Sequence, residues 1–362
     1  MLPTDRLDYD LPPDLIATHP ASPRDASRMM VVSRTDPDRL EHRTFHDLTD
    51  YLTPTDVLVR NRSAVLPARL AGRRDDSNGR IEGLFLQEHG PGDWTVMLKS
   101  NGRLREGLVI NLYHPDDPGH AGVTLHIIAR DSTGWRVAIT PDDPAPRTLA
   151  RVGATPLPPC ILSSRRASND TTPDERDRAD YQTIYADANA LGSVAAPTAG
   201  LHFTPALEAA LASVGVRTSE VVLHVGAGTF APVTADNVED HPIHSEHTEV
   251  PPETVRAIAD ARRSGGRSVC VGTTTVRALE SLGPGQSGFS GPTGLLISPG
   301  HTFRMTDALI TNFHLPRSTL LAMVCALFDD PDPVERLIAC YERAIEERYR
   351  FYSFGDAMLI LP

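Results

Sequence analysis

The sequence predicts an α/β protein in which a mixed, mostly parallel α/β sandwich domain carries a small inserted β-barrel domain. After residue 180, strand and helix patterns alternate, which is typical of a largely parallel sheet covered by helices. Between residues 61 and 152, short strands follow one another about every 12 residues, separated by Gly, Asp and Pro, which favours a barrel. We therefore expect a discontinuous α/β catalytic domain, 1–60 and 153–362, and a β-barrel domain, 61–152.

The predicted barrel strands are short apolar or alternating segments. They cover residues 81–86, 94–98, 108–112, 123–128 and 135–139. The segment 141–159 is rich in proline, so we expect it to return the chain to the larger domain.

The larger domain is predicted to begin with a short, proline-initiated helix at 11–17 and two buried strands at 29–32 and 57–59. Beyond residue 180, the expected helices are 205–212, 252–263, 274–282, 318–328 and 333–348. The expected strands are 219–225, 268–271 and 307–310. A chain of 362 residues is long enough to bury a large core in two domains.

The net charge of −12 argues against a protein that coats nucleic acid nonspecifically, because such binding depends on neutralising phosphates. Between Arg60 and Glu106, however, nine basic and six acidic side chains leave a local charge of +3. Lys99 is the only lysine, which disfavours Schiff-base catalysis and leaves anion recognition to arginine.

The cysteines and the N-terminus indicate a cytoplasmic protein. Four cysteines lie far apart without a C-x-x-C pair, so we expect reduced thiols and no metal site. The first residues lack the layout of a signal peptide. No apolar run approaches the roughly 20 residues of a membrane-spanning helix, so no membrane association is expected.

Five segments in the second half combine glycine with hydroxyl and histidine side chains. They are residues 192–204, 223–230, 244–249, 271–277 and 311–319. Glycine lets the backbone approach a ligand closely. The pattern suggests one site assembled from several loops.

The segment 271–277 reads Val-Gly-Thr-Thr-Thr-Val-Arg and predicts a strand that runs into a helix start. Free N–H groups and the positive end of the helix dipole would suit a carboxylate or phosphate there. The alternative is a threonine that only caps the helix. A P-loop is excluded because the G-K-[ST] ending is absent.

Residues 226–231 fit the G-x-G-x-x-A pattern of a dinucleotide-binding turn, and Glu246 follows 20 residues after Gly226. Pro232 stands where the helix of that motif should open, so a nicotinamide site is disfavoured. The better interpretation is a glycine loop that contacts a small ligand, or a tight turn.

Several histidines with Gly, Thr or Glu neighbours are candidates for acid–base chemistry. They are His202, His224, His244, His247 and His314. Asn312 and His314 alternate in an extended stretch and should share a face. Zinc is a rival interpretation, but the spacing of these histidines does not match a zinc site.

At these segments the chain closely resembles the S-adenosylmethionine:tRNA ribosyltransferase-isomerases of queuosine biosynthesis. The resemblance extends over essentially the full length. It rests on 181–185, 192–204, 223–230, 239–246, 272–281, 311–321 and 349–358, with 11–32 and 65–70 nearer the N-terminus. The family fold is an α/β domain with an inserted β-barrel.

The resemblance implies that S-adenosylmethionine donates its ribosyl group to 7-aminomethyl-7-deazaguanine at the tRNA wobble position. The ribose is isomerised to give epoxyqueuosine, and adenine and methionine leave. S-adenosylmethionine is then a co-substrate, and no permanently bound cofactor or metal is needed. The chemistry requires a base at C5′ beside the sulfonium, an acid for adenine and a neutral acceptor amine.

The motifs and the resemblance together assign site residues. The expected catalytic residues are His202, His224, Glu246, Glu249 and His314. The expected contacts to S-adenosylmethionine are Thr198, Gly226, Gly228, Thr229, Phe230, Thr273, Thr274, Thr275 and Asn312. The expected contacts to the acceptor or to tRNA phosphates are Arg28, Arg69, Arg277 and Arg317.

Two alternatives stay open. One is a paralogous enzyme that uses the same cleft on a free 7-deazapurine or another small acceptor. It is motivated by the net charge and by departures from the family pattern at residues 61–65, Cys160, Asp180 and His247. The other is a non-catalytic homologue that binds RNA or a nucleoside, against which the retained His202, His224, Glu246 and His314 argue.

Overall fold

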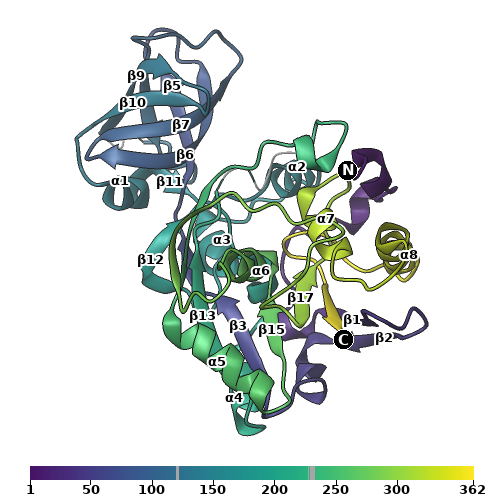
Figure 1. Cartoon of the computed structure of the whole chain (residues 1–362). Coiled ribbons are helices and arrows are strands. Elements are labelled where there is room, and N and C mark those ends of the chain that lie inside the picture. Colours follow the sequence, from purple (N-terminus) through teal and green to yellow (C-terminus); the bar gives the residue numbers. More distant parts are fainter. Residues whose placement is uncertain (120–121, 227, 229–232) are drawn as a thin grey trace.

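The computed structural model describes residues 1–119, 122–226, 228 and 233–362 (Figure 1). An α/β part contains both chain termini, and a β-barrel projects from one end of it. Among the described residues, no helix combines the length and apolar character that crossing a membrane requires.

A nine-stranded mixed sheet forms the centre of the α/β part, in the order β16-β14-β13-β3-β15-β17-β18-β1-β2. The strands β13, β3, β15 and β17 run parallel at the centre. Towards one edge, β14 and β16 are antiparallel to their neighbours, and towards the other, β18 is antiparallel to β17, β1 is parallel to β18 and β2 is antiparallel to β1. Their bounds are β1 (Arg28–Ser33), β2 (Leu40–Thr44), β3 (Val57–Asn61), β13 (Arg217–Leu223), β14 (Glu246–Val250), β15 (Ser268–Val271), β16 (Phe289–Thr293), β17 (Ala308–Asn312) and β18 (Ala357–Leu361).

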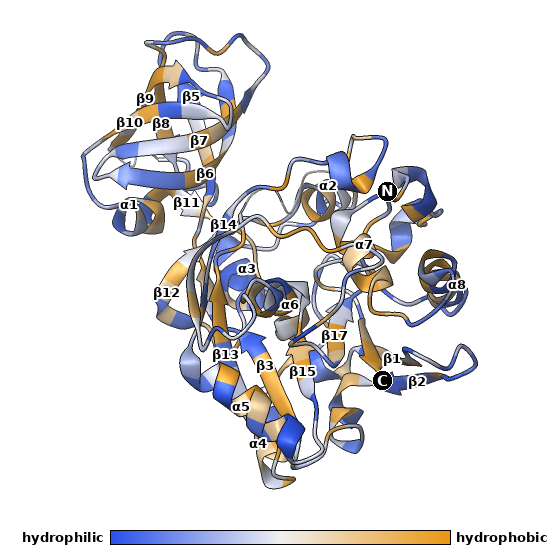
Figure 2. Cartoon of the chain, viewed as in Figure 1, coloured by the Kyte–Doolittle hydropathy of each residue, from blue (hydrophilic) through white to orange (hydrophobic). Residues whose placement is uncertain are grey.

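Helices cover both faces of this sheet because its central strands are apolar on both faces. Val57 and Val59 face one core and Leu58 faces the other, as the alternation of a strand requires. The first core takes α5 (Pro252–Arg263), α6 (Thr273–Glu280), α7 (Thr319–Cys325) and α8 (Pro333–Glu346), and the second takes α4 (Pro205–Ser213) and the 3-10 helix η4 (Phe45–Asp50). Figure 2 shows apolar strands inside and polar helix faces outside.

The barrel contains six strands that close on themselves through the β5–β8 pair. They are β5 (Arg69–Arg74), β6 (Arg80–Gly90), β7 (Asp93–Ser100), β8 (Val109–Tyr113), β9 (Val123–Arg130) and β10 (Trp135–Thr140). Trp94, Val96 and Leu125 fill the interior, and Leu149 of α1 (Ala145–Val152) packs against the same core. The predicted fold class, an α/β protein with a barrel, is confirmed, and the division of the chain at 61 and 152 stays a prediction.

Several local predictions differ from the structure, three of them as follows. Residues 11–17 form only the 3-10 turn η2 (Pro13–Leu15), after which Ile16 pairs with Phe351. Segment 141–159, expected only as a proline-rich connection, contains helix α1. Pro146 is compatible with this helix because it lies in the first turn, where proline is tolerated. Strand β5 was not expected, since only Leu70 and Gly72 of it point inward and the rest is polar or small.

The remaining elements include those at the junction of the two parts. They are β4 (Ser63–Val65), β11 (Gly153–Ala154), β12 (Asp187–Ser193), α2 (Pro159–Ala167), α3 (Asp174–Asp180), η1 (Thr4–Leu7), η3 (Arg24–Ala26), η5 (Thr198–His202) and η7 (Val238–Asp240). β12 pairs parallel with β4 beside the barrel, and β11 pairs with β5. The chain therefore enters and leaves the barrel next to the loops that follow the central strands.

Candidate active site

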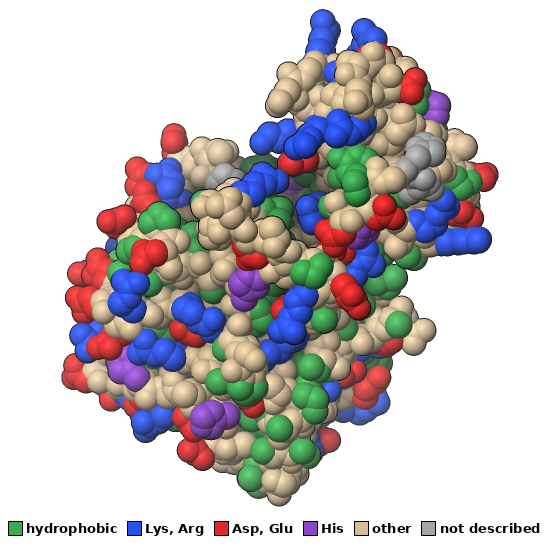
Figure 3. Space-filling view, turned by 180° about the vertical axis from the view of Figure 1, so that it is seen from behind, with side chains coloured by type: hydrophobic (Ala, Val, Ile, Leu, Met, Phe, Trp, Pro, Cys, Tyr) green, Lys and Arg blue, Asp and Glu red, His purple; other side chains and the backbone are tan. Residues whose placement is uncertain are grey.

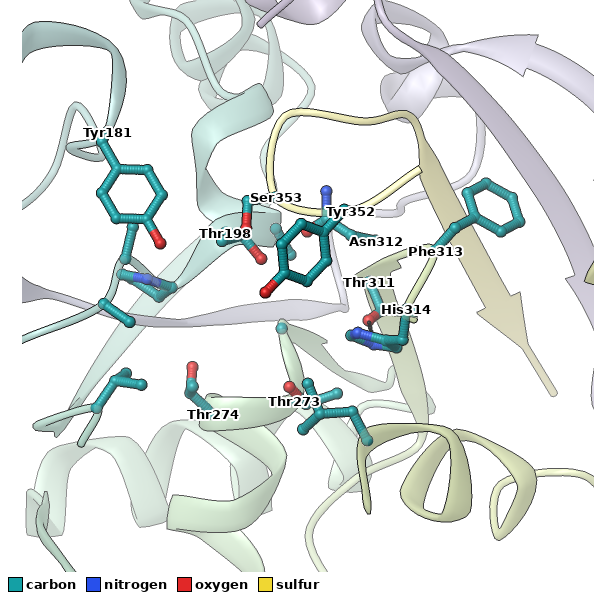
Figure 4. Close-up of a pocket in the computed structure, with 17 residues that line it drawn as sticks. Tyr181, Thr198, Thr273, Thr274, Thr311, Asn312, Phe313, His314, Tyr352 and Ser353 are labelled. Carbon is teal, nitrogen blue, oxygen red and sulfur yellow. Dashed lines mark hydrogen bonds between the residues drawn. The ribbon is translucent and has the colours of Figure 1, made fainter. Parts of the chain in front are cut away.

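A pocket of about 580 Å³, open to solvent, lies where β15 and β17 end. In open α/β sheets, ligands bind outside the carboxyl ends of the strands. Its wall consists of Tyr181, Ala195, Ala196, Pro197, Thr198, Ala199, Val225, Gly272, Thr273, Thr274, Thr311, Asn312, Phe313, His314, Leu320, Tyr352 and Ser353. Figure 3 shows the hollowed surface between the barrel and the α/β part, and Figure 4 shows the pocket.

Helix α6 points its N-terminus at this pocket. Gly272 precedes the helix with φ +86°, a conformation that favours glycine, and among the described residues no side chain caps the helix. The hydroxyl of Thr274 is buried and has no hydrogen-bond partner within the described ranges of the chain. Free N–H groups and an unpartnered hydroxyl at the positive end of a helix can bind a carboxylate or phosphate.

Thr275 differs from its two neighbours, although all three threonines were expected to contact the ligand. Its hydroxyl donates to the carbonyl of Val271 at 2.7 Å and does not line the pocket. Thr198, from η5, lines the opposite wall.

Asn312 is held by a buried chain of hydrogen bonds. Its Nδ2 donates to Nε2 of His202 at 3.2 Å, so Nδ1 of His202 carries the proton and donates to Ser27 Oγ at 2.8 Å. The Oδ1 of Asn312 is buried and has no partner among the residues that the structure describes, so it can accept a hydrogen bond from a ligand. His202 does not line the pocket and acts on it through Asn312.

Burial keeps His202 neutral. The ring is 5% exposed and stacks on Phe45 at 4.8 Å between ring centroids. This burial, with smaller contributions from Arg350 and Arg24, lowers the pKa of His202 to about 3. At pH 7 the neutral ring keeps a lone pair on Nε2, which accepts the hydrogen bond from Asn312.

His314 lines the pocket directly. Its Nε2 is hydrogen-bonded to Thr311 Oγ1 at 2.9 Å, and its backbone N–H donates to the hydroxyl of Tyr341 at 3.0 Å. Burial lowers the pKa of His314 to about 4. The site therefore presents a neutral imidazole to its ligand at pH 7.

His224 and Glu249 lie outside the wall of this pocket. The His224 ring stacks on that of His247 at 6.0 Å and packs against Gly192, where a Cβ would approach the ring to 2.8 Å. Burial, followed by His247, lowers the pKa of His224. Glu249 is exposed on β14. The catalytic assignment of both residues stays a prediction.

Glu246 is buried in a clamp with Arg277. Its Oε1 accepts from the backbone N–H of Gly226 at 2.7 Å, and its Oε2 pairs with Arg277 Nη1. Burial raises the pKa of Glu246, while Arg277 and the Gly226 N–H oppose this rise. The remaining donors of Arg277 bind the carbonyls of His244, Thr293 and Leu295. The clamp thus ties the Gly226 loop to α6.

The glycine loop continues at Gly228, where a Cβ would collide with the ring of His244. Thr229 and Phe230, which were expected to contact S-adenosylmethionine, lie outside the described residues.

The other arginines also make specific contacts. Arg28 lies over the ring of Tyr349 at 3.8 Å, and Arg317 pairs with Asp5 at 2.7 Å. Arg69 donates to the carbonyl of Thr155 at 3.0 Å, where the barrel meets the α/β part. The expected contacts of Arg28, Arg69, Arg277 and Arg317 with acceptor or tRNA stay predictions.

The sequence did not single out Tyr181, Tyr352 and Ser353 as site residues, although each lies in a segment that carries the family resemblance. Tyr352 has φ +75°, which is rare for an aromatic residue, and its N–H donates to the carbonyl of Phe313 at 2.9 Å. Such strain costs roughly 1–3 kcal/mol and concentrates at functional sites. The feature that marks Tyr352 as a site residue is its backbone conformation, which cannot be predicted from the residue type.

The fold and the pocket define an α/β protein with a polar small-molecule site at the carboxyl ends of its central strands, beside an attached barrel. The family model described as "Queuosine biosynthesis protein" matches residues 4–360, so the chain belongs to this enzyme family. The resemblance drawn from the sequence is thereby confirmed.

Two relatives are each named S-adenosylmethionine:tRNA ribosyltransferase-isomerase. One, from Anaeromyxobacter sp. (strain Fw109-5), is 46% identical over 98% of this chain and 97% of its own length. The other, from Thermotoga maritima, is 46% identical over 98% of both chains. The crystal structure of S-adenosylmethionine tRNA ribosyltransferase from Thermotoga maritima is similar with a TM-score of 0.53 and 35% identity. It covers 98% of this chain and 100% of that chain.

The buried His202 should make folding stability depend on pH. Its pKa is about 3 in the folded chain and 6.5 when unperturbed, so between these values the unfolded chain binds an additional proton. The stabilisation is complete above about pH 6.5 and declines as the pH falls. Between pH 7 and pH 5, the parent protein should lose about 2 kcal/mol more of its unfolding free energy than His202→Gln does. Urea unfolding followed by circular dichroism at the two pH values measures both losses. Equal losses in both proteins would show that His202 is protonated in the folded state.

The Glu246–Arg277 clamp should contribute to stability. Arg277→Met leaves a buried carboxylate without its partner and is expected to lower the free energy of urea unfolding by roughly 3 kcal/mol. The double variant Glu246→Gln/Arg277→Met should recover part of this loss, because no unpaired charge remains. If Arg277→Met unfolds like the parent, the clamp is not structural and Arg277 is free for another ligand.

Proposed function

We propose that this protein transfers and isomerises the ribosyl group of S-adenosylmethionine onto 7-aminomethyl-7-deazaguanine at the tRNA wobble position. The products are epoxyqueuosine-tRNA, adenine and methionine. Family membership over nearly the full length supports this reaction class. The observation that carries the proposal is the uncapped start of α6, with the unpartnered Thr274 hydroxyl, in one pocket with the neutral His314.

The start of α6 supplies the anion site of this proposal. The methionine carboxylate of S-adenosylmethionine lies against the N–H groups and the hydroxyl of Thr274, where the helix dipole is favourable. The Oδ1 of Asn312 accepts a hydrogen bond from a hydroxyl or amino group of the same molecule. His202 and Ser27 hold Asn312 in this orientation and are positioning residues.

The cationic sulfonium of S-adenosylmethionine also suits this pocket. The rings of Tyr181 and Tyr352 line it, and an aromatic face attracts a positively charged ligand. His202 and His314 stay uncharged at pH 7, so neither repels the sulfonium.

His314 is the acid–base group of the proposal, because it is the histidine in the wall of the pocket among the described residues. As a neutral imidazole it can accept the proton at C5′ beside the sulfonium, with Thr311 fixing the orientation of its ring. The reaction as proposed takes place in the cytoplasm and requires no permanently bound cofactor or metal.

The proposal is tested with purified protein, S-adenosylmethionine and a tRNA that carries the aminomethyl-deazaguanine. We expect release of adenine and methionine together with a mass gain on the tRNA. His314→Gln should lower turnover by about 10²-fold or more, with S-adenosylmethionine binding nearly unchanged. Turnover with the free base alone would replace the proposal by the paralogous enzyme. Binding without turnover on any acceptor would replace it by the non-catalytic homologue.

Adjacent threonines of α6 provide a matched pair for the anion site. Thr274→Val removes the hydroxyl that faces the pocket and should weaken S-adenosylmethionine binding about tenfold, measured by titration calorimetry. Thr275→Val removes a hydroxyl that is bonded to the carbonyl of Val271 at the end of β15 and should leave binding within about twofold. Equal weakening by both substitutions would contradict the placement of the carboxylate.

A further inference from the structure

Unpaired basic side chains gather on the barrel. Of 35 Lys and Arg residues, 25 take part in an ion pair between described residues, which leaves ten. Six of these ten belong to the barrel strands and their connections: Arg69, Arg73, Arg80, Lys99, Arg103 and Arg130. Residues 61–152 hold only 12 of the 35 basic residues.

Four of these side chains share the outer face of strands β5, β6 and β7. Leu70, Ile81 and Val96 of these strands point into the barrel core, so the alternate residues point outward. Arg69 and Arg73 are on β5, Arg80 is on β6 and Lys99 is on β7. We call this surface the β5–β7 face.

The register places Arg73 directly opposite Arg80 in an antiparallel pair. Like charges in this position destabilise a sheet. Neither side chain has an acidic partner among the described residues; Arg73 donates only to the carbonyl of Asn78. An anion that binds to this surface from outside the chain would relieve the repulsion between Arg73 and Arg80.

The β5–β7 face begins next to the proposed active site. Arg69 donates to the carbonyl of Thr155, which lines a second pocket of about 400 Å³ together with Val65, Leu66, Pro67, Pro156, Arg178, Tyr181 and Gln182. Tyr181 lines both pockets. From Arg69 to Arg73 the strand rises roughly 13 Å away from this junction. Figure 3 shows Lys and Arg side chains on the barrel where it borders the hollow.

The charge balance selects the side from which an anion approaches. Residues 61–152 contain 12 basic and 11 acidic residues, a net charge of +1. The rest of the chain contains 23 basic and 36 acidic residues, a net charge of −13. A polyanion is therefore repelled by most of the α/β part and can reach the pocket beside the barrel.

We propose that the β5–β7 face binds the phosphate backbone of the tRNA and delivers the wobble nucleotide to the pocket by way of Tyr181. This inference rests on the proposed function. Glu82 lies opposite Lys99 on the same face and pairs with Arg166 at 3.2 Å. It is the acidic residue whose removal should make the face bind more tightly.

The test compares two double variants of equal charge in binding to an unmodified tRNA transcript at several salt concentrations. Arg73→Gln/Arg80→Gln should reduce the slope of log K against log[salt] by roughly 2, because two phosphate contacts are lost. Arg217→Gln/Arg256→Gln is the control. It removes two exposed cations without ion pairs, on β13 and on α5, the latter at the end of the α/β part away from the barrel (Figure 1). This control should keep the parent slope.

Further measurements separate tRNA binding from folding and from chemistry. Removing the Arg73–Arg80 repulsion should leave the thermal midpoint equal or higher, whereas a misfolded barrel would lower it. Glu82→Gln should strengthen tRNA binding. Equal slopes for both double variants, or wild-type protein that binds no tRNA, would overturn this inference. If the protein turns over on tRNA but the slope is unchanged in Arg73→Gln/Arg80→Gln, the inference about the β5–β7 face is wrong and the proposed function stands. If tRNA binds normally but no turnover occurs, only the proposed function is wrong.

Discussion

The site depends on the burial of the central parallel strands on both faces. Every residue of β3, β15 and β17 is buried between two helical layers. A shift of register by one residue would exchange the two apolar faces, so the position of each strand end is fixed. Gly272 and Asn312 stand at these ends, and polar groups can leave the core only there. This constraint brings Thr274, Asn312 and His314 into one pocket.

The same burial sets the electrostatics of the pocket. It holds His202 and His314 in their neutral forms, and it leaves hydrogen-bonding groups of Thr274 and Asn312 without partners among the described residues. Neutral donors and acceptors at a helix start can bind a molecule that carries both a carboxylate and a cation. Buried polar groups without partners destabilise the free protein, and a ligand that satisfies them is bound correspondingly more tightly.

The two parts of the chain use arginine differently. In the α/β part the guanidinium groups stabilise the fold itself, as in the pair of Arg267 with the buried Asp56 and in the Arg277 clamp. On the barrel, Arg73 and Arg80 face each other, and neither has an acidic partner in the part of the chain that the structure describes. A chain with a net charge of −12 therefore presents a basic surface beside its active site.

The sequence determined whatever depends on near neighbours. The apolar run at 268–271 and the helix periodicity of 252–263 predicted β15 and α5, and the strand-Gly-Thr pattern predicted the start of α6. Tertiary structure decided what depends on distant residues. It placed His202 behind Asn312, 110 positions away, directed the Thr275 hydroxyl to the carbonyl of Val271 and gave Tyr352 a positive φ at the pocket. Residue type and spacing predict backbone conformation and which side of an element is buried. Hydrogen bonds between residues far apart in the chain form only when the sheet and its helices pack together.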